Sequence, residues 1–398
     1  MELAGSGWKM ITRIEASRYR CLQSVNQSLE PFQILVGPNG SGKSAFLDVV
    51  AFLGTSVSEG LQAALDERTE NFYDLVWGRE GSSFELAIEA KIPEDRRVPI
   101  QSGTPEAVRY EVEIRLDPST ETLVYARERA SIRTAGSDWQ SAIKVVSRDP
   151  KFVHFQFEVT PQVGDVAIHP NYSSLPNLVD DSKFPATAWF RDLLSRGVQS
   201  VKLDVNELRK PSPLHHGTLK RFTGSSLARA VNQLKENGAE NFEAWLAHLR
   251  TSLPDLDGVR TVLRPEDKHR YLMVRYDNGV EVPSWALSEG TLRLLALTLL
   301  AYVPDFQGVY LVKEPENGVH PAAIETIYQS LSSIYEGQVL MASHSPILLS
   351  LAKPEELLCF AKTPEGTAIV RGSEHPALRE WRGEVNLSDL FAAGVLGK

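Results

Sequence analysis

The chain has 398 residues, which is long enough for one large domain or two ordinary ones, each with its own core. Apolar residues make up 42% and charged residues 23% of it, the balance of a soluble globular protein. Its net charge of −9 argues against a protein whose whole surface coats nucleic acid, although a local basic patch remains compatible with it.

Cysteine content and hydropathy indicate the compartment. The two cysteines, Cys21 and Cys359, are too few for a disulfide framework or a metal-ligand set, which fits a reducing cytosol. The longest apolar run, residues 294–303, is about half of what a bilayer span needs. Residues 1–9 contain no apolar signal core, and Met10 can serve as the natural start. We therefore expect a cytoplasmic protein without membrane contact.

The first half of the chain reads mainly as strands. Alternating apolar residues predict strands over 11–19 and 32–36, and the second runs into a glycine-rich loop. A helix is expected over 44–66. Strand patterns separated by Pro, Gly and Asp then follow over 83–91, 109–116, 121–127 and 152–159. These short strands indicate an antiparallel sheet layer.

The period becomes helical over 186–253, and strand patterns return over 259–263 and 271–276. In the last third, helices and strands alternate: a helix is predicted over 288–302, a strand over 309–312, a helix over 321–335 and a strand over 338–342. Apolar strands that alternate with helices imply a parallel sheet covered on both faces. The predicted fold class is therefore α/β.

The first motif with chemical content is Gly37-Pro38-Asn39-Gly40-Ser41-Gly42-Lys43-Ser44, a full match to the P-loop pattern between a strand and a helix. Its glycines let consecutive backbone N–H groups point at phosphate oxygens, at the positive end of the following helix. Lys43 is expected to reach the β- and γ-phosphates of ATP, and Ser44 to offer its hydroxyl to Mg²⁺.

The second motif is Ser288-Glu289-Gly290-Thr291, directly before an apolar helix. Alone it reads equally well as an ordinary helix N-cap. Its place between the P-loop and a strand that ends in acidic residues resembles the signature motif of ATP-binding cassettes. That resemblance implies that Ser288, Gly290 and Thr291 contact the γ-phosphate held by another subunit's P-loop.

The third motif ends the strand at 309–312 and reads Lys313-Glu314-Pro315-Glu316. It resembles the Walker B arrangement, in which one acid holds Mg²⁺ through water and the next polarises the attacking water. Glu314 matches the catalytic glutamate, but Lys313 stands where an acid is usual. A lysine cannot coordinate Mg²⁺ and would repel it, so weakened metal binding or turnover is expected.

The fourth motif, Ser343-His344-Ser345-Pro346, follows the strand at 338–342. A lone histidine is more often structural than functional, but His344 stands where a cassette's switch histidine contacts the γ-phosphate. Together the four motifs resemble the branch of ATP-binding-cassette ATPases that contains RecF, the SMC proteins and the OLD-family and related defence ATPases. The likeness is clearest in residues 10–48 and 284–348.

The resemblance implies a division of the chain into three parts. Residues 10–185 would form an N-terminal ATPase lobe with the P-loop and antiparallel strands. Residues 186–283 would form an inserted helical lobe with returning strands. Residues 284–398 would form a C-terminal ATPase lobe that carries the signature motif, Glu314, His344 and a docking tail.

One segment is markedly basic. Residues 186–235 hold nine Lys or Arg against three acids, among them Lys220, Arg221 and Arg229. A solvated basic face and a patch for the phosphate backbone of DNA explain this equally well. No recognition-helix pattern is visible, so any binding would not read sequence.

The expected function is that of an ATPase that closes as a homodimer on two ATP molecules and reopens after hydrolysis. We expect a nucleic-acid-linked regulator in prokaryotic defence or DNA repair, which controls a separately encoded nuclease or toxin. The alternative is a non-hydrolysing ATP-binding scaffold, because of Lys313. A transporter cassette disagrees with the spacing of the motifs.

Overall fold

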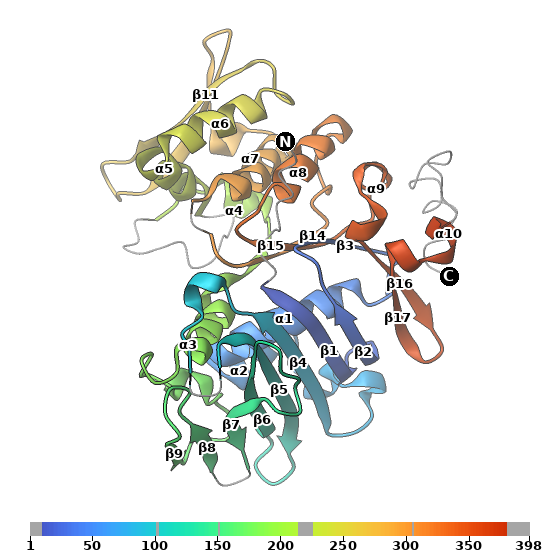
Figure 1. The fold of residues 1–398 in the computed structure, drawn as a ribbon. Coiled ribbons are helices and arrows are strands. Elements are labelled where there is room, and N and C mark those ends of the chain that lie inside the picture. The colour runs from blue at the N-terminus through green and yellow to red at the C-terminus, as the bar shows by residue number, and fades with distance from the viewer. Residues whose placement is uncertain (1–9, 101–102, 150–151, 214–225, 305, 380–398) are drawn as a thin grey trace.

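The computed structural model describes residues 10–100, 103–149, 152–213, 226–304 and 306–379. Three sheets organise these residues: an antiparallel sheet of eight strands, a mostly parallel sheet of six and a small sheet of three (Figure 1). The predicted α/β class, with an antiparallel layer and a parallel sheet, is confirmed.

The first sheet has the order β2-β1-β4-β5-β6-β7-β8-β9, and all its neighbouring strands are antiparallel. Its strands are β1 (Ile11–Tyr19), β2 (Leu22–Ser28), β4 (Ser83–Lys91), β5 (Pro105–Asp117), β6 (Thr122–Thr134), β7 (Ile143–Arg148), β8 (Val153–Gln156) and β9 (Val163–Val166). The sequence did not predict β2, because its residues, LQSVNQS, are mostly polar and lack apolar alternation.

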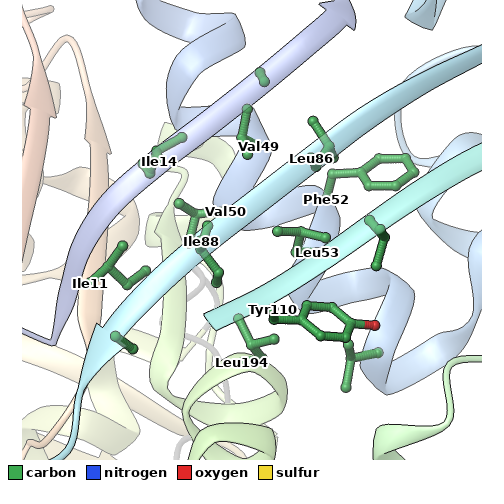
Figure 2. Close-up of a cluster of buried hydrophobic side chains, with 14 of the residues drawn as sticks. Ile11, Ile14, Val49, Val50, Phe52, Leu53, Leu86, Ile88, Tyr110 and Leu194 are labelled. Atoms are coloured by element: carbon green, nitrogen blue, oxygen red, sulfur yellow. The ribbon is translucent and has the colours of Figure 1, made fainter. Parts of the chain in front are cut away.

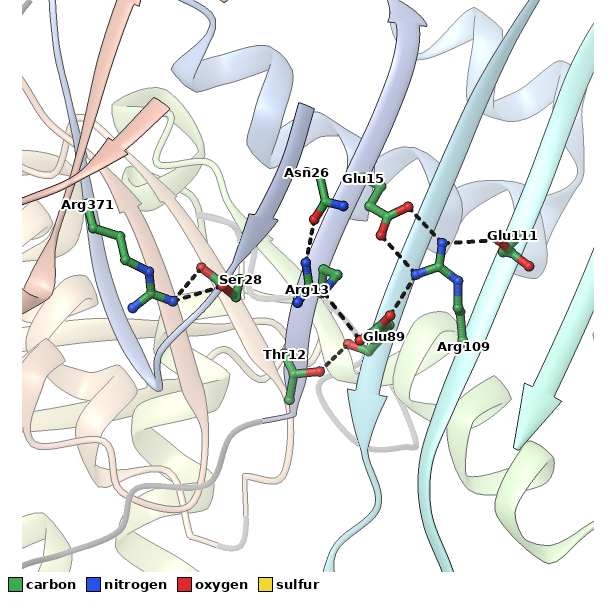
Figure 3. Close-up of polar contacts among 9 residues, drawn as sticks. All are labelled: Thr12, Arg13, Glu15, Asn26, Ser28, Glu89, Arg109, Glu111 and Arg371. Carbon is green, nitrogen blue, oxygen red and sulfur yellow. Dashed lines mark hydrogen bonds and ion pairs between the residues drawn. The ribbon is translucent and has the colours of Figure 1, made fainter. Parts of the chain in front are cut away.

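One face of this sheet packs against α1 (Lys43–Glu59) in a cluster that we call the first core (Figure 2). Ile11, Ile14, Leu86, Ile88 and Tyr110 of the strands meet Val49, Val50, Phe52 and Leu53 of the helix. The opposite face is charged, because successive side chains of a strand point to opposite sides. There Arg109 bonds the carboxylates of Glu15 on β1, Glu89 on β4 and Glu111 on its own strand (Figure 3).

The second sheet, in the middle of the molecule, has the order β10-β14-β15-β3-β16-β17 and is parallel except at its last pair. Its strands are β10 (Val198–Val201), β14 (Val309–Lys313), β15 (Gln338–Ala342), β3 (Phe32–Val36), β16 (Leu357–Thr363) and β17 (Gly366–Arg371). Along β14, Val309 and Leu311 enter the first core, whereas Tyr310 and Val312 enter a second one. Both faces are thus buried, which explains the apolar strands.

The second core lies between this sheet and a set of helices. They are α4 (Val205–Arg209), α5 (Leu227–Asn237), α6 (Ala239–Leu249), α7 (Glu289–Leu299), α8 (Pro321–Ser332) and α9 (Pro346–Leu351). The three-stranded sheet of β11 (Leu256–Leu263), β12 (Arg270–Tyr276) and β13 (Glu281–Pro283) completes this side. Trp245 is fully buried there, and its indole N–H donates to Thr298 Oγ1 over 2.9 Å.

Two segments of the sequence prediction can be placed in the structure. The helix expected over 44–66 is divided at Gly60 (φ 95°) into α1 and α2 (Leu61–Asp66). In the segment after residue 185, where the helical lobe is expected to begin, Phe190 of α3 (Pro185–Asp192) and Leu194 pack in the first core and β10 joins the central sheet.

The last helix of the described residues is α10 (Pro376–Arg379), so the expected docking tail lies mostly outside them. Within the described ranges, no helix has the length and apolar character needed to cross a bilayer.

Candidate functional site

The loop of residues 37–44 connects β3 to α1 and lies against the hairpin of β16 and β17. Gly37 has φ 146°, and a Cβ there would lie 2.2 Å from the carbonyl oxygen of Phe360. Gly42 has φ 106°, and a Cβ there would lie 2.4 Å from Thr367 Oγ1. Both positions require glycine, because a side chain would be strained and would collide with the hairpin.

The loop presents donors that suit an anion. Gly42 caps α1 without any side-chain hydrogen bond, so the first N–H groups of this 17-residue helix have no side-chain acceptor. Ser41 Oγ is buried and has no partner among the described residues. A phosphate group would satisfy these donors at the positive end of the helix dipole. The residues therefore fit the triphosphate of a nucleotide.

Lys43 lies folded against its own loop. Its ammonium donates to the carbonyl oxygens of Gly37 (2.8 Å) and Pro38 (3.0 Å). Burial lowers the pKa of Lys43 to about 8, although the negative charges of Glu314 and Glu316 oppose this shift. Two neutral carbonyls compensate a buried cation poorly, so an incoming polyphosphate is a better partner for it.

Glu314 follows β14 and has a left-handed backbone, with φ 49°. Its N–H donates to the carbonyl oxygen of Ala342 at 2.8 Å, which fixes the turn to the end of β15. The side-chain amide of Asn317 donates to its carboxylate at 2.5 Å. These contacts hold the carboxylate at the wall of the cavity that Lys43 and Ser44 also line.

His344 follows β15 and is positioned by Glu316. The Oε1 atom of Glu316 accepts from the His344 backbone N–H (2.7 Å) and from Ser343 Oγ (2.9 Å). Burial and the charge of Lys43 lower the pKa of His344, against the opposing pull of Glu314 and Glu316. The ring is therefore neutral at neutral pH and can accept or donate one hydrogen bond.

These groups share one cavity, the first cavity, of about 690 Å³. Of the predicted site residues, Asn39, Gly40, Ser41, Gly42, Lys43, Ser44, Glu314 and His344 line it. Sequence reasoning missed Trp77 and Arg79, and also the hairpin turn at 362–367. No local pattern marks them, because only the tertiary fold brings them to the P-loop.

The signature residues lie elsewhere. Ser288 caps α7, since its Oγ accepts from the backbone N–H of Thr291 at 3.1 Å. A Cβ on Gly290 would lie 3.1 Å from the carbonyl oxygen of Gly318, so this helix start adjoins the loop after β14. Neither Ser288, Gly290 nor Thr291 lines the first cavity. Within one chain, the two motifs do not meet.

Lys313 is also absent from the first cavity. It ends β14 on the same face as Val309 and Leu311, and it lines a separate space with Asp48 of α1. Burial lowers the pKa of Lys313, while Asp48 opposes the shift. Lys313 thus lines a different cavity from Ser44, the residue expected to hold Mg²⁺.

Asp48 is the buried acid around which this second group is arranged. It accepts from Tyr19 Oη (2.6 Å), Arg20 (2.9 Å) and Arg68 (2.8 Å). Burial alone would raise its pKa, but Arg68, Tyr19 and Arg20 together hold the pKa of Asp48 below its usual value. No sequence pattern predicts this network, because its members are far apart in the chain.

The basic segment at 186–235 is not one surface in the part that the structure describes. Arg191 pairs with Asp181 and Asp192, on the side of the first core. Arg229 belongs to α5, on the side of the second core. Lys220 and Arg221 lie outside the described residues.

The chain is similar to known proteins over most of its length. A family described as "AAA domain, putative AbiEii toxin, Type IV TA system" matches residues 32–350. An OLD nuclease from Thermus scotoductus is 21% identical over 406 residues, which cover 96% of this chain and 68% of that protein.

Two solved SMC heads share the fold. One is an SMC head bound to the C-winged helix domain of ScpA, with a TM-score of 0.53 and 17% sequence identity. The match covers 91% of this chain and 97% of that SMC head chain. The other is an SMC head domain with an extended coiled coil, bound to the C-terminal domain of ScpA derived from Pyrococcus furiosus. Its TM-score is 0.53 and its sequence identity 16%, and the match covers 91% of this chain and 96% of that SMC head chain. The chain therefore belongs to the family described as AAA domain, putative AbiEii toxin, Type IV TA system, and it shares its fold with the SMC heads.

Proposed function

We propose that the chain binds ATP with Mg²⁺ in the first cavity and hydrolyses it. The observation that carries this proposal is the convergence of Lys43, Ser44, Glu314 and His344 on one cavity of about 690 Å³. Such a volume lies within the range of small-molecule sites, about 300–1,000 Å³. The buried, unpartnered Ser41 Oγ and the uncapped start of α1 provide donors for the phosphates.

Each residue has a distinct role in this proposal. Lys43 exchanges the carbonyls of Gly37 and Pro38 for the β- and γ-phosphates, and the exchange restores its full positive charge. Ser44 is exposed at the cavity and offers its hydroxyl to Mg²⁺, which neutralises phosphate charge when bound. Glu314 accepts a proton from the attacking water, and neutral His344 hydrogen-bonds the γ-phosphate.

The signature residues act on a second chain in this proposal. Ser288 is exposed at the start of α7 and lies outside the cavity of its own chain. A helix start with Ser, Gly and Thr suits an anion supplied by another subunit. Two chains would thus close head to tail on two ATP molecules, and hydrolysis would reopen them.

We further propose that this cycle regulates a separately encoded nuclease or toxin in prokaryotic defence or DNA repair, with nucleic acid as the trigger and the cytoplasm as the compartment. The support is the similarity to an OLD nuclease and to a family described as putative toxins. A second candidate is a non-hydrolysing scaffold that only binds ATP. It is favoured by Lys313, which stands in place of the usual metal-binding acid.

The test compares ATP binding, dimerisation and phosphate release in the wild-type chain and in Lys43→Ala. We expect Lys43→Ala to lose both ATP binding and ATP-induced dimerisation, because the loop loses its mobile cation. Lys144→Ala, at an exposed position of β7, serves as the control and should behave like the wild type. Full ATP affinity in Lys43→Ala would refute the site. Tight binding without phosphate release by the wild type would establish the scaffold instead.

A further inference from the structure

The first cavity extends beyond the groups that suit a triphosphate. The P-loop, Glu314 and His344 face the phosphates in the proposed complex. The remaining wall comes from three segments: the turn at 20–21 between β1 and β2, the loop at 74–79 after α2, and the hairpin turn at 362–367. A nucleotide whose phosphates lie on the P-loop must place its nucleoside against these segments, because they form the rest of the wall.

Trp77 is the large aromatic residue of this part of the wall. Among the described residues that line the cavity, only Trp77 and His344 carry an aromatic ring. Trp77 is partly buried, yet it packs in neither the first core nor the second.

The indole of Trp77 also has no partner among the described residues. Its N–H donates no hydrogen bond there, and its ring contacts no other aromatic ring and no cation. The other described tryptophans each have a contact with a ring or a cation: Trp139, Trp189, Trp245 and Trp285. A partly buried indole without such a contact, on the wall of a cavity, has a face available for a flat ligand.

The backbone fixes the position of Trp77 on both sides. Val76, directly before it, is buried in the first core and forms a β-bridge with Tyr19. Directly after it, the chain turns at Gly78, which has φ 64°. The N–H of Glu80 then donates to the carbonyl oxygen of Trp77 at 3.3 Å. A side chain on such a support loses little freedom when a ligand stacks on it.

We propose that Trp77 binds the base of the nucleotide by stacking, so that the site takes a nucleoside triphosphate in preference to a bare polyphosphate. This inference rests on the proposed function and adds the residue that recognises the nucleoside. Every base has a flat π face, and stacking on an aromatic side chain strengthens binding by about 5- to 150-fold. Val76 and Pro364 line the same cavity and add apolar surface.

Two ligands separate the base from the phosphates: the β,γ-imido analogue of ATP, which resists hydrolysis, and inorganic tripolyphosphate. The binding of each is measured by calorimetry at constant Mg²⁺ and ionic strength. We expect Trp77→Ala to weaken binding of the analogue by about 5- to 150-fold and to leave binding of tripolyphosphate unchanged. Trp77→Phe should keep most of the affinity for the analogue, whereas Trp77→Leu, which is apolar but has no π face, should lose it. Trp139→Ala removes a partly buried tryptophan outside the first cavity and should change neither affinity.

Three results would overturn the proposal: an unchanged affinity of Trp77→Ala for the analogue, an equal loss of both ligands in that variant, or equally tight binding of the analogue by Trp77→Leu and Trp77→Phe. Thermal melting shows whether each variant is folded, and the comparison of Trp77→Phe with Trp77→Leu decides the question should Trp77→Ala not fold. A failure of the proposed function looks different. The wild-type chain would then bind neither the analogue nor tripolyphosphate, and the role of Trp77 would fall with it.

Discussion

The lowered pKa of Lys43 predicts how the affinity for ATP depends on pH. Burial lowers the pKa of this lysine to about 8 in the nucleotide-free chain, where its only hydrogen-bond acceptors within the described residues are two loop carbonyls. In the complex the phosphates must hold it protonated, so that its pKa rises well above 8. Binding above pH 8 therefore requires uptake of a proton, and the affinity for ATP should fall as the pH rises.

The magnitude follows from the protonated fraction. At pH 7 about nine-tenths of the free chains carry a charged Lys43, and at pH 9 about one-eleventh do. The affinity should thus be nearly constant up to about pH 7.5 and should weaken about tenfold between pH 7 and pH 9. Above pH 8 the slope of log Kd on pH should approach one, or about 1.4 kcal/mol per pH unit.

The assay is equilibrium binding of ATP to Glu314→Gln, which avoids turnover, at pH values from 7 to 10 and constant salt. Saturating Mg²⁺ is included, because it lowers the last pKa of the γ-phosphate of ATP and leaves the nucleotide fully ionised over this range, so that it adds no slope. The matched control is Lys43→Arg in the same background, because a guanidinium does not titrate below pH 12. A flat profile for the chain that retains Lys43, or an equally steep profile for Lys43→Arg, would refute this account of the P-loop lysine.

The remaining predictions concern catalysis, stability and DNA. Glu314→Gln should lower turnover by about 10²–10⁴-fold while an ATP-bound dimer accumulates in size-exclusion chromatography; parental turnover would assign the base elsewhere. Asp48→Asn breaks the buried ion pair with Arg68, which keeps only its contact with the more exposed Glu67, and should lower the free energy of unfolding in urea by about 3–5 kcal/mol. The exposed Asp165→Asn is its control and should change this free energy by less than about 1 kcal/mol. Charge reversal at Lys220, Arg221 and Arg229 should weaken any binding to duplex DNA and reduce its log–log salt slope by about 0.9 per lost phosphate contact; an unchanged titration would assign these residues to solvation.

The sequence predicted those parts of the site whose geometry is local. The P-loop motif contains its own glycines, its lysine and the start of its helix, so its shape follows from consecutive residues. Glu314 and His344 each end a parallel strand, and parallel strands bring their carboxyl ends to one edge of the sheet. Their convergence on one cavity could therefore be expected before the fold was known.

The parts that escaped prediction depend on packing between distant segments. Lys313 points toward Asp48 because α1 covers that face of β14, and no motif specifies which helix lies there. Trp77 and Arg79 reach the first cavity only through the path of the chain after α2. The packing of α3 also escaped prediction, because α3 is as helical in pattern as the segment that follows, although it packs in the first core.

The left-handed backbone of Glu314 bears on how such a chain evolves. A residue with a side chain is less stable in this conformation than glycine, by roughly 1–2 kcal/mol. Mutational drift toward glycine at position 314 would thus raise stability at the same time as it removed the carboxylate. A glutamate persists there only while selection for its catalytic carboxylate outweighs the stability gained by a change to glycine. In descendants that keep ATP binding but have abandoned turnover, this position should be among the first to change.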